Sequence, residues 1–322
     1  MGAAPRTRTP ISQAIAEGIL TRAELRQLMK RSNRLPAMHL AIWIAVASGT
    51  GTLIAVTFDS WLRWPAMFLH GVVLVHHFSI QHECTHYTAF RTRPVNDIVG
   101  AICGLIIGLA PRFFRYEHCD HHTWTQVAGR DPEQIPLPKS MGGYLWYMTA
   151  VPYWTTKARE LSRHVVGRLT DAERKFVPRE EHRTVILESR IMVAAYVGVV
   201  AVAVWLQWSA PIWYWALPVL MGEPVMRAIR MTEHVGRQPI DDMRLNTRTN
   251  LVSKPLQMLC WNMNFHAEHH YAASVPYHAL PALHRRLVGH LVVEPRGYLG
   301  AHTDMVLQIR GRRPRSDSED PR

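Results

Sequence analysis

The sequence predicts an all-α polytopic membrane protein, with four transmembrane helices in two hairpins and a cytosolic helical cap that carries clustered histidines. Two observations support this prediction. Long runs contain no charged residue, and three groups of histidines spaced three and four residues apart lie outside those runs. With 322 residues, 48% of them hydrophobic, the chain is long enough to cross a membrane several times.

The N-terminal segment, residues 1–34, is polar and basic. Residues 11–34 are predicted to form one or two amphipathic helices. Thr21 and Glu24 match a capping box, in which each side chain bonds to the backbone N–H of the other residue. We therefore expect this segment to lie on the membrane surface.

Three uncharged runs supply the four predicted spans. Residues 35–58 and 64–81 are each near the roughly 20 residues that a spanning helix needs. The run 191–222 is interrupted by Ser209, Ala210 and Pro211. At ~1.5 Å per residue, it is about long enough for two spans joined by a tight turn. The apolar segment 98–111 is too short to cross, so we expect it to be interfacial or re-entrant.

The distribution of basic residues predicts the orientation of these spans. The short turns 59–63 and 209–211 carry little positive charge, whereas arginine and lysine are frequent in the N-terminal segment and in the long loops. The positive-inside rule then places all three histidine groups on the cytoplasmic side. We expect an integral protein of a bacterial inner membrane.

The net charge of +12 indicates contact with anionic headgroups rather than with nucleic acid, because the basic residues flank the spans. The four cysteines form no disulfide pattern, as expected in a reducing compartment. Residues 35–310 are predicted to form one membrane domain, and residues 311–322 a disordered tail.

Eight histidines lie in three boxes whose spacing is typical of metal ligands, because residues i, i+3 and i+4 share one face of a helix. Neutral imidazole is a common ligand of Zn, Fe, Cu and Ni, and eight imidazoles are about twice what one tetrahedral zinc uses. The sequence therefore predicts two metal ions. The first box is HxxxH and the others are HxxHH; they comprise His82 and His86, then His118, His121 and His122, then His266, His269 and His270.

Four carboxylates adjoin histidines and are candidates to accept an N–H from a ligating imidazole, which would orient the ring and raise its basicity. They are Glu83, Asp120, Glu233 and Glu268. His76 and His77 lie within the second predicted span and are left out of the ligand set.

The first box has a competing interpretation, because residues 82–86 also match HExxH, the zinc metalloprotease motif in which the glutamate is the general base. A protease needs only one more ligand, so both HxxHH boxes would be surplus. A two-metal site uses all of them. An intramembrane zinc protease and a noncatalytic metal-binding membrane protein remain alternatives.

Together, the boxes and spans resemble the integral-membrane fatty acid desaturase and hydroxylase superfamily, which has HxxxH, HxxHH and HxxHH boxes on the cytosolic side of four spans. The resemblance covers about residues 35–291. HECTH followed by YTAF looks like the first box of acyl-lipid desaturases, and FHAEHH followed by YxxSVPYHALPALH is similar to bacterial members. The chain departs from many relatives at Tyr271-Ala272-Ala273, where they have an aromatic–proline pair.

The resemblance implies two iron ions, dioxygen as oxidant, and an acyl chain or related lipid as substrate. It also implies one further ligand after the fourth span, a place that His234 occupies. Breaking an unactivated C–H bond is beyond any side-chain acid or base, which agrees with an iron oxidant. The expected activity is desaturation. The alternative is a hydroxylase or ketolase that acts on a hydrophobic substrate such as a carotenoid.

The electrons for such a reaction are expected to come from a partner protein. The sequence contains no CxxCH haem attachment motif, no ferredoxin-like cysteine run and no GxGxxG after a predicted strand. A separate ferredoxin, rubredoxin or cytochrome donor is implied, and the basic cytosolic face would suit the acidic surface that such proteins often have.

Overall fold

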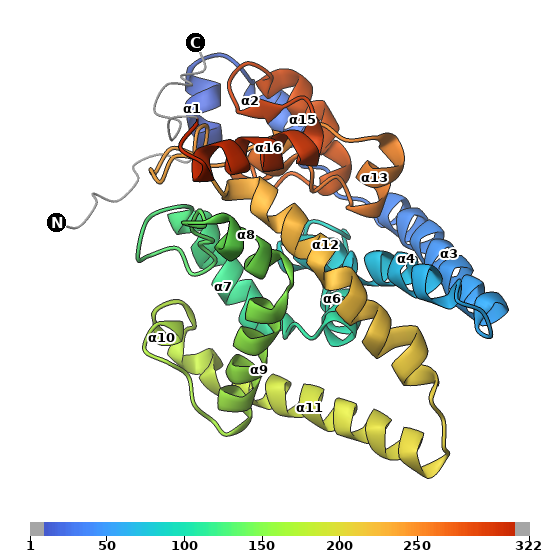
Figure 1. Cartoon of the computed structure of the whole chain (residues 1–322). Helices are drawn as coiled ribbons and strands as arrows, with labels where there is room; N and C mark the ends of the chain where they lie inside the picture. The colour runs from blue at the N-terminus through green and yellow to red at the C-terminus, as the bar shows by residue number, and fades with distance from the viewer. Residues whose placement is uncertain (1–9, 313–322) are drawn as a thin grey trace.

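The computed structural model describes residues 10–312, which fold almost entirely into helices (Figure 1). The long helices α3, α4, α11 and α12 extend towards one end of the molecule, whereas α1, α2, α13, α15 and α16 gather at the other (Figure 1). The predicted tail from residue 311 lies almost wholly outside the described residues. The helices are α1 (Pro10–Ala16), α2 (Arg22–Leu28), α3 (Arg34–Thr57), α4 (Arg63–Val75), α5 (His77–Thr85), α6 (Arg93–Ile107), α7 (Pro111–Trp124), α8 (Met141–Met148), α9 (Val151–Val165), α10 (Glu173–Phe176), α11 (His182–Trp205), α12 (Leu217–His234), α13 (Lys254–Leu259), α14 (His266–Tyr271), α15 (Leu280–Leu287) and α16 (Gly297–Ile309).

Two helices are long and apolar enough to cross a membrane. They cover residues 34–57 and 179–205, and they correspond to the first and third predicted spans. The second of them consists of a 3₁₀ turn at Arg179–Glu181 followed by α11. Both helices expose most of their apolar side chains, as expected for surfaces that face lipid.

The second predicted span is not one continuous helix, because His76 separates α4 from α5. The His76 Nδ1–H donates to the Val72 carbonyl at 2.6 Å, and the His77 Nδ1–H donates to the Leu74 carbonyl at 2.6 Å. The side chains thus take carbonyls that would accept backbone N–H groups, a recognised cause of helix breaks. Hydropathy does not reveal this competition.

The fourth predicted span begins as a π-helical turn at Ile212–Ala216 and continues into α12. Helix α12 carries Glu223, Arg227, Arg230 and Glu233 in its second half, and it packs closely on α4. The contact is possible because Gly71 and Gly222 face each other: a Cβ atom on either would clash with backbone of the opposing helix. This packing holds α12 against the helix that leads to the first histidine box.

The short apolar segment predicted to be re-entrant forms the end of α6 and the sharp turn that follows it. Helices α6 and α7 are bent by 97° at a break where Gly108 has φ +76°. Such a left-handed conformation is readily adopted by glycine. Because the box before α6 and the box on α7 meet in one cluster, the bent pair returns to the side from which it starts.

The opposite end is a cap built from both chain ends. The capping box of α2 is confirmed: the Glu24 N–H donates to the Thr21 hydroxyl, and the Thr21 N–H donates to the Glu24 carboxylate. Ala14 and Leu20 are buried in the same core as Tyr271 and Leu283, so the N-terminal helices pack on the third-box region. Two short strands, β1 (Thr249–Asn250) and β2 (Val293–Glu294), pair in parallel there.

Candidate metal centre

Four helices bring the predicted histidines together. His82 lies on α5 and His86 caps its C-terminal end, while the second box occupies the last two turns of α7. His234 is the last residue of α12, and the third box forms most of α14. Each HxxHH box is helical, so its first and last histidines are one turn apart on the same face.

All nine predicted ligands gather in two adjacent clusters, and within each cluster the candidate ligand atoms lie within 4.8 Å of one another. The five-histidine cluster comprises His82, His86, His118, His122 and His269. The four-histidine cluster comprises His121, His234, His266 and His270.

The two HxxHH boxes divide reciprocally between the clusters. The one-turn pair of the second box, His118 and His122, belongs to the five-histidine cluster, and His121 between them belongs to the other. In the third box, the outer pair belongs to the four-histidine cluster and His269 to the first. Neighbouring helical residues point about 100° apart, so each of these helices serves both clusters.

The ring nitrogens are arranged as ligands rather than as hydrogen-bond partners. The Nε2 atoms of His118 and His122 lie 3.1 Å apart, as do those of His122 and His269. In the other cluster, the Nε2 atom of His266 is 2.9 Å from that of His234 and 3.0 Å from that of His270. Nitrogens bound at right angles to one metal, at about 2.1 Å each, would lie about 3.0 Å apart.

The opposite ring nitrogen of several histidines donates to a fixed acceptor, which leaves Nε2 as a bare lone pair. His118 Nδ1–H donates to Glu133 and His121 Nδ1–H donates to Asp131, each at 2.7 Å. His234 Nδ1–H donates to the Asn246 carbonyl at 3.2 Å. Two facing lone pairs repel, and a shared cation removes that repulsion. The residues present therefore fit a bound metal in each cluster.

Burial keeps these imidazoles neutral. It is the main cause that lowers the pKa of eight of the nine histidines, with nearby histidines adding to the effect. His121 is the exception: burial opposes its charging, but the carboxylates of Glu133 and Asp131 outweigh burial and raise its pKa. A neutral imidazole is the form that binds metal.

The four carboxylates singled out by sequence take different positions. A Glu83 oxygen is 4.0 Å from His269 Nδ1, and a Glu233 oxygen is 3.7 Å from His266 Nε2. Glu268 accepts from His284 Nδ1–H at 2.6 Å, and His284 belongs to neither cluster. Asp120 is partly exposed and interacts with Trp124 and Arg130.

The carboxylates that hold the second box were missed by the sequence analysis. Asp131 and Glu133 lie in the loop after α7, which turns back at Gly129 (φ +72°) and returns them to the box. Arg230 of α12 connects this loop to the second cluster, because its guanidinium donates to Glu133 at 2.7 Å and also to Glu233. A carboxylate in a short loop after a histidine box was the available signal.

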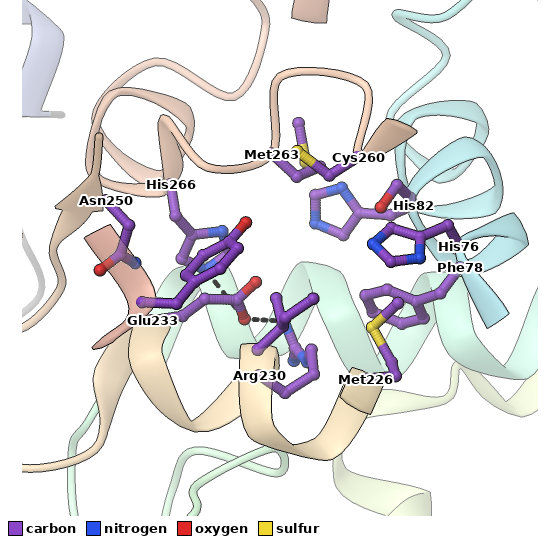
Figure 2. A pocket seen from close by; sticks show the side chains of 13 residues that line it. His76, Phe78, His82, Met226, Arg230, Glu233, Asn250, Cys260, Met263 and His266 are labelled. Atoms are coloured by element: carbon purple, nitrogen blue, oxygen red, sulfur yellow. Dashed lines mark hydrogen bonds and ion pairs between the residues drawn. The ribbon is translucent and has the colours of Figure 1, made fainter. Parts of the chain in front are cut away.

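A small enclosed cavity of about 10 Å³, room for about one water molecule, adjoins both clusters. His82 of the five-histidine cluster and His266 of the four-histidine cluster both line it. Arg230 and Glu233 lie between His266 on one side and His76, Phe78 and His82 on the other (Figure 2). His76 and His77 stay outside both clusters.

A larger cavity of about 260 Å³ lies next to the small one and is bounded by α7, α9 and α12. Phe78 and Arg230 line both cavities, and the Arg230 guanidinium lies 4.9 Å from the centre of the Phe78 ring. These two side chains therefore separate the larger cavity from the metal centre.

Comparison with known proteins gives one family. The family described as fatty acid desaturase matches residues 59–298. The chain is 23% identical over 274 residues to "Omega-6 fatty acid desaturase, chloroplastic" of Brassica napus, covering 77% of this chain and 59% of the relative.

Bacterial relatives give similar values. Over 180 residues, the chain is 24% identical to "sn-1 acyl-lipid omega-3 desaturase (ferredoxin)" of Nostoc sp. (strain 36), covering 52% of this chain and 48% of the relative. Over 265 residues, it is 22% identical to "sn-1 oleoyl-lipid 12-desaturase" of Picosynechococcus sp., covering 74% and 73%. The chain thus spans about half to three-fifths of the length of the first two relatives.

Proposed function

The chain belongs to the fatty acid desaturase family, and from this premise we propose that it is a dioxygen-dependent di-iron desaturase that introduces a double bond into a fatty acyl chain or a related lipid. The observation that carries the proposal is the gathering of nine neutral, buried imidazoles into two adjacent clusters. Five imidazoles in one cluster exceed the four ligands of a tetrahedral structural zinc, which favours a metal of higher coordination number.

The proposed reaction converts –CH2–CH2–, dioxygen, two electrons and two protons into –CH=CH– and two water molecules. Bound iron would supply the oxidising power, and the protein supplies position and dryness. The histidines hold the metals in the neutral form. Asp131 and Glu133 fix the orientation of two ligands, as we also propose for Glu83 and Glu233.

The two cavities suggest how the substrate is placed. Carbon atoms that enter the small cavity would lie next to one ligand of each cluster, His82 and His266. Phe78, Met226, Ile229 and Met263 supply apolar wall for a hydrocarbon segment. We propose that the chain reaches this position from the larger cavity past Phe78, since that ring lines both spaces.

The membrane arrangement belongs to the same proposal. Helices α3, α4–α5, α11 and the π-helical turn with α12 would form four spans, with the metal centre on the cytoplasmic side of a bacterial inner membrane. The second half of α12 would then emerge from the membrane, which accommodates its four charged residues. The donor would be a ferredoxin, as the name of the Nostoc relative specifies for that protein.

The protease alternative is disfavoured by the surroundings of Glu83. Its carboxylate accepts from the Thr88 hydroxyl at 2.8 Å and from the Tyr277 N–H at 3.3 Å, and the side chain is fully buried. A general base must reach a metal-bound water, whereas Glu83 bonds to the scaffold. Desaturation and hydroxylation differ only in the fate of the second hydrogen, and substrate placement decides between them.

Lipid profiling by mass spectrometry tests this function. The chain is expressed with a ferredoxin and its reductase, and a loss of about two mass units per substrate indicates desaturation, whereas a gain of about sixteen indicates hydroxylation. His121→Ala and His269→Ala, one from each cluster, should both abolish the product. His290→Ala, an exposed histidine, is the control and should retain it. Full turnover in the first two variants would refute the site.

A further inference from the structure

Electrons must reach the metal centre from outside, and the two clusters differ in how close they come to the surface. All four histidines of the four-histidine cluster are buried, whereas His86 and His122 of the five-histidine cluster are partly exposed. The centres of these two rings are 4.7 Å apart, so they reach the surface together. Among the described residues, the shortest route to either cluster therefore runs through His86 and His122.

Each of these histidines is followed by an aromatic ring that stacks on arginine. The Tyr87 ring lies between two guanidinium groups, with Arg115 at 3.8 Å and Arg93 at 4.2 Å from its centre. Trp124, two residues after His122, has the Arg130 guanidinium at 4.0 Å. Arg91, Arg93 and Arg130 are exposed.

We propose that this surface is where an acidic, one-electron carrier protein of the ferredoxin type docks. We call it the His86–His122 face, formed by Tyr87, Arg91, Arg93, Arg115, Trp124 and Arg130. Four arginines stand against two nearby aspartates, Asp97, which pairs with Arg115, and Asp120. A positive surface attracts and orients a negative partner. This inference rests on the proposed function, because it assumes that the metals are reduced by a separate protein.

The position of the arginines favours a protein over a lipid as the occupant. A site for anionic headgroups requires only basic residues at the membrane level. This surface instead centres on the two histidines that expose the metal cluster, and its arginines order rings that directly follow those ligands. Each docking delivers one electron: the carrier is oxidised by one electron and the metal pair gains it. Two encounters therefore supply the two electrons of one turnover.

Binding and reduction measurements test the proposal in the iron-loaded protein, held in nanodiscs of neutral phosphatidylcholine. The probe is a plant-type ferredoxin, titrated in its oxidised form for affinity and mixed in its reduced form for the rate of electron transfer. The triple variant Arg91→Glu, Arg93→Glu, Arg130→Glu should raise the Kd and lower the second-order rate by about tenfold or more at low salt. Rising salt should shrink this difference.

A matched variant has the same change in charge elsewhere. Arg168→Glu, Lys175→Glu, Arg183→Glu alters three exposed basic residues around α10, and it should leave ferredoxin binding within about twofold. Equal effects of the two triple variants would overturn the proposal. If the first triple variant lost its iron, the milder triple replacement by glutamine would be compared in the same way.

Two further outcomes separate the possible failures. If the defect appeared only in nanodiscs that contain anionic phosphatidylglycerol, the arginines would act on lipid and the docking proposal would be wrong. Reduction by dithionite bypasses the surface, so a single turnover after it should be equal in both triple variants and the wild type. A wild type that desaturates after dithionite while the first triple variant binds ferredoxin normally refutes only the docking surface. A wild type without iron or product refutes the function itself.

Discussion

Replacement of Asp131 by asparagine should weaken metal binding in the four-histidine cluster alone. The Asp131 side chain is 1% exposed, and its oxygens accept from His121 Nδ1–H at 2.7 Å and from the Gln126 and Glu133 N–H groups at 2.8 and 2.9 Å. Asparagine keeps the shape but loses the charge and replaces one accepting oxygen by an NH2 group. His121 would then lose the partner that fixes which nitrogen carries its proton.

Two estimates give the size of this effect. A hydrogen bond to a charged group contributes roughly 1.5–3 kcal/mol. Removal of the carboxylate partner of a metal-ligating histidine commonly lowers metal affinity about 10- to 100-fold, which corresponds to about 1.4–2.7 kcal/mol. We therefore expect a loss in this range at one metal and little change at the other, since none of the Asp131 contacts above is to a residue of the five-histidine cluster.

Chelator titration with iron analysis measures the loss. Asp131→Asn should release one iron per chain at a chelator concentration about 10- to 100-fold lower than the wild type does, and retain the second iron. Asp120→Asn is the matched control, because Asp120 adjoins His121 in sequence but interacts with Trp124 and Arg130. The reasoning is refuted if Asp120→Asn loses iron and Asp131→Asn does not.

Three further predictions concern packing, metal and the first box. Gly222→Ala should destabilise the protein by about 1–3 kcal/mol or more, seen as a lower thermal midpoint, because its Cβ meets the Gly71 backbone; Gly198→Ala, where a Cβ has open space, should not. Removal of metal should cost about 2.7 kcal/mol per site for iron present at 100 times its Kd, measured as a drop in the midpoint that Fe²⁺ reverses and Mg²⁺ does not. Glu83→Gln should retain iron and a measurable fraction of desaturation, because glutamine can still accept from Thr88, whereas a peptidase that uses Glu83 as its base would lose all turnover.

The ligand set was predictable from sequence because metal ligation leaves a local pattern. A histidine one turn from another on a helix is visible in the spacing alone, and all eight box histidines join the two clusters, with His234, expected from the family resemblance, as the ninth. The capping box at Thr21 and Glu24 was predictable for the same reason: its partners are three residues apart.

Features that depend on tertiary contacts were not predictable in the same way. The division of each HxxHH box between two clusters depends on how α7 and α14 face each other, which no spacing records. Asp131 and Glu133 reach the second box only because the chain turns back at Gly129. Sequence adjacency instead indicated Asp120, which lies beside His121 in the chain but on another side of the helix.

The second predicted span shows the same limit in the membrane part. The run 64–81 is uncharged, so hydropathy predicts one helix, but the imidazoles of His76 and His77 take backbone carbonyls and divide it into α4 and α5. The break places His76 in the wall of the cavity beside the clusters. A polar residue within an apolar run was thus the sign of a functional irregularity.

Anomalous X-ray scattering at the iron edge tests the central claim most directly, because it locates each metal among its ligands. The structure predicts two peaks, one among His82, His86, His118, His122 and His269 and one among His121, His234, His266 and His270. A single peak, a signal at the zinc edge alone, or metal bound away from these imidazoles would contradict a di-iron centre in this protein.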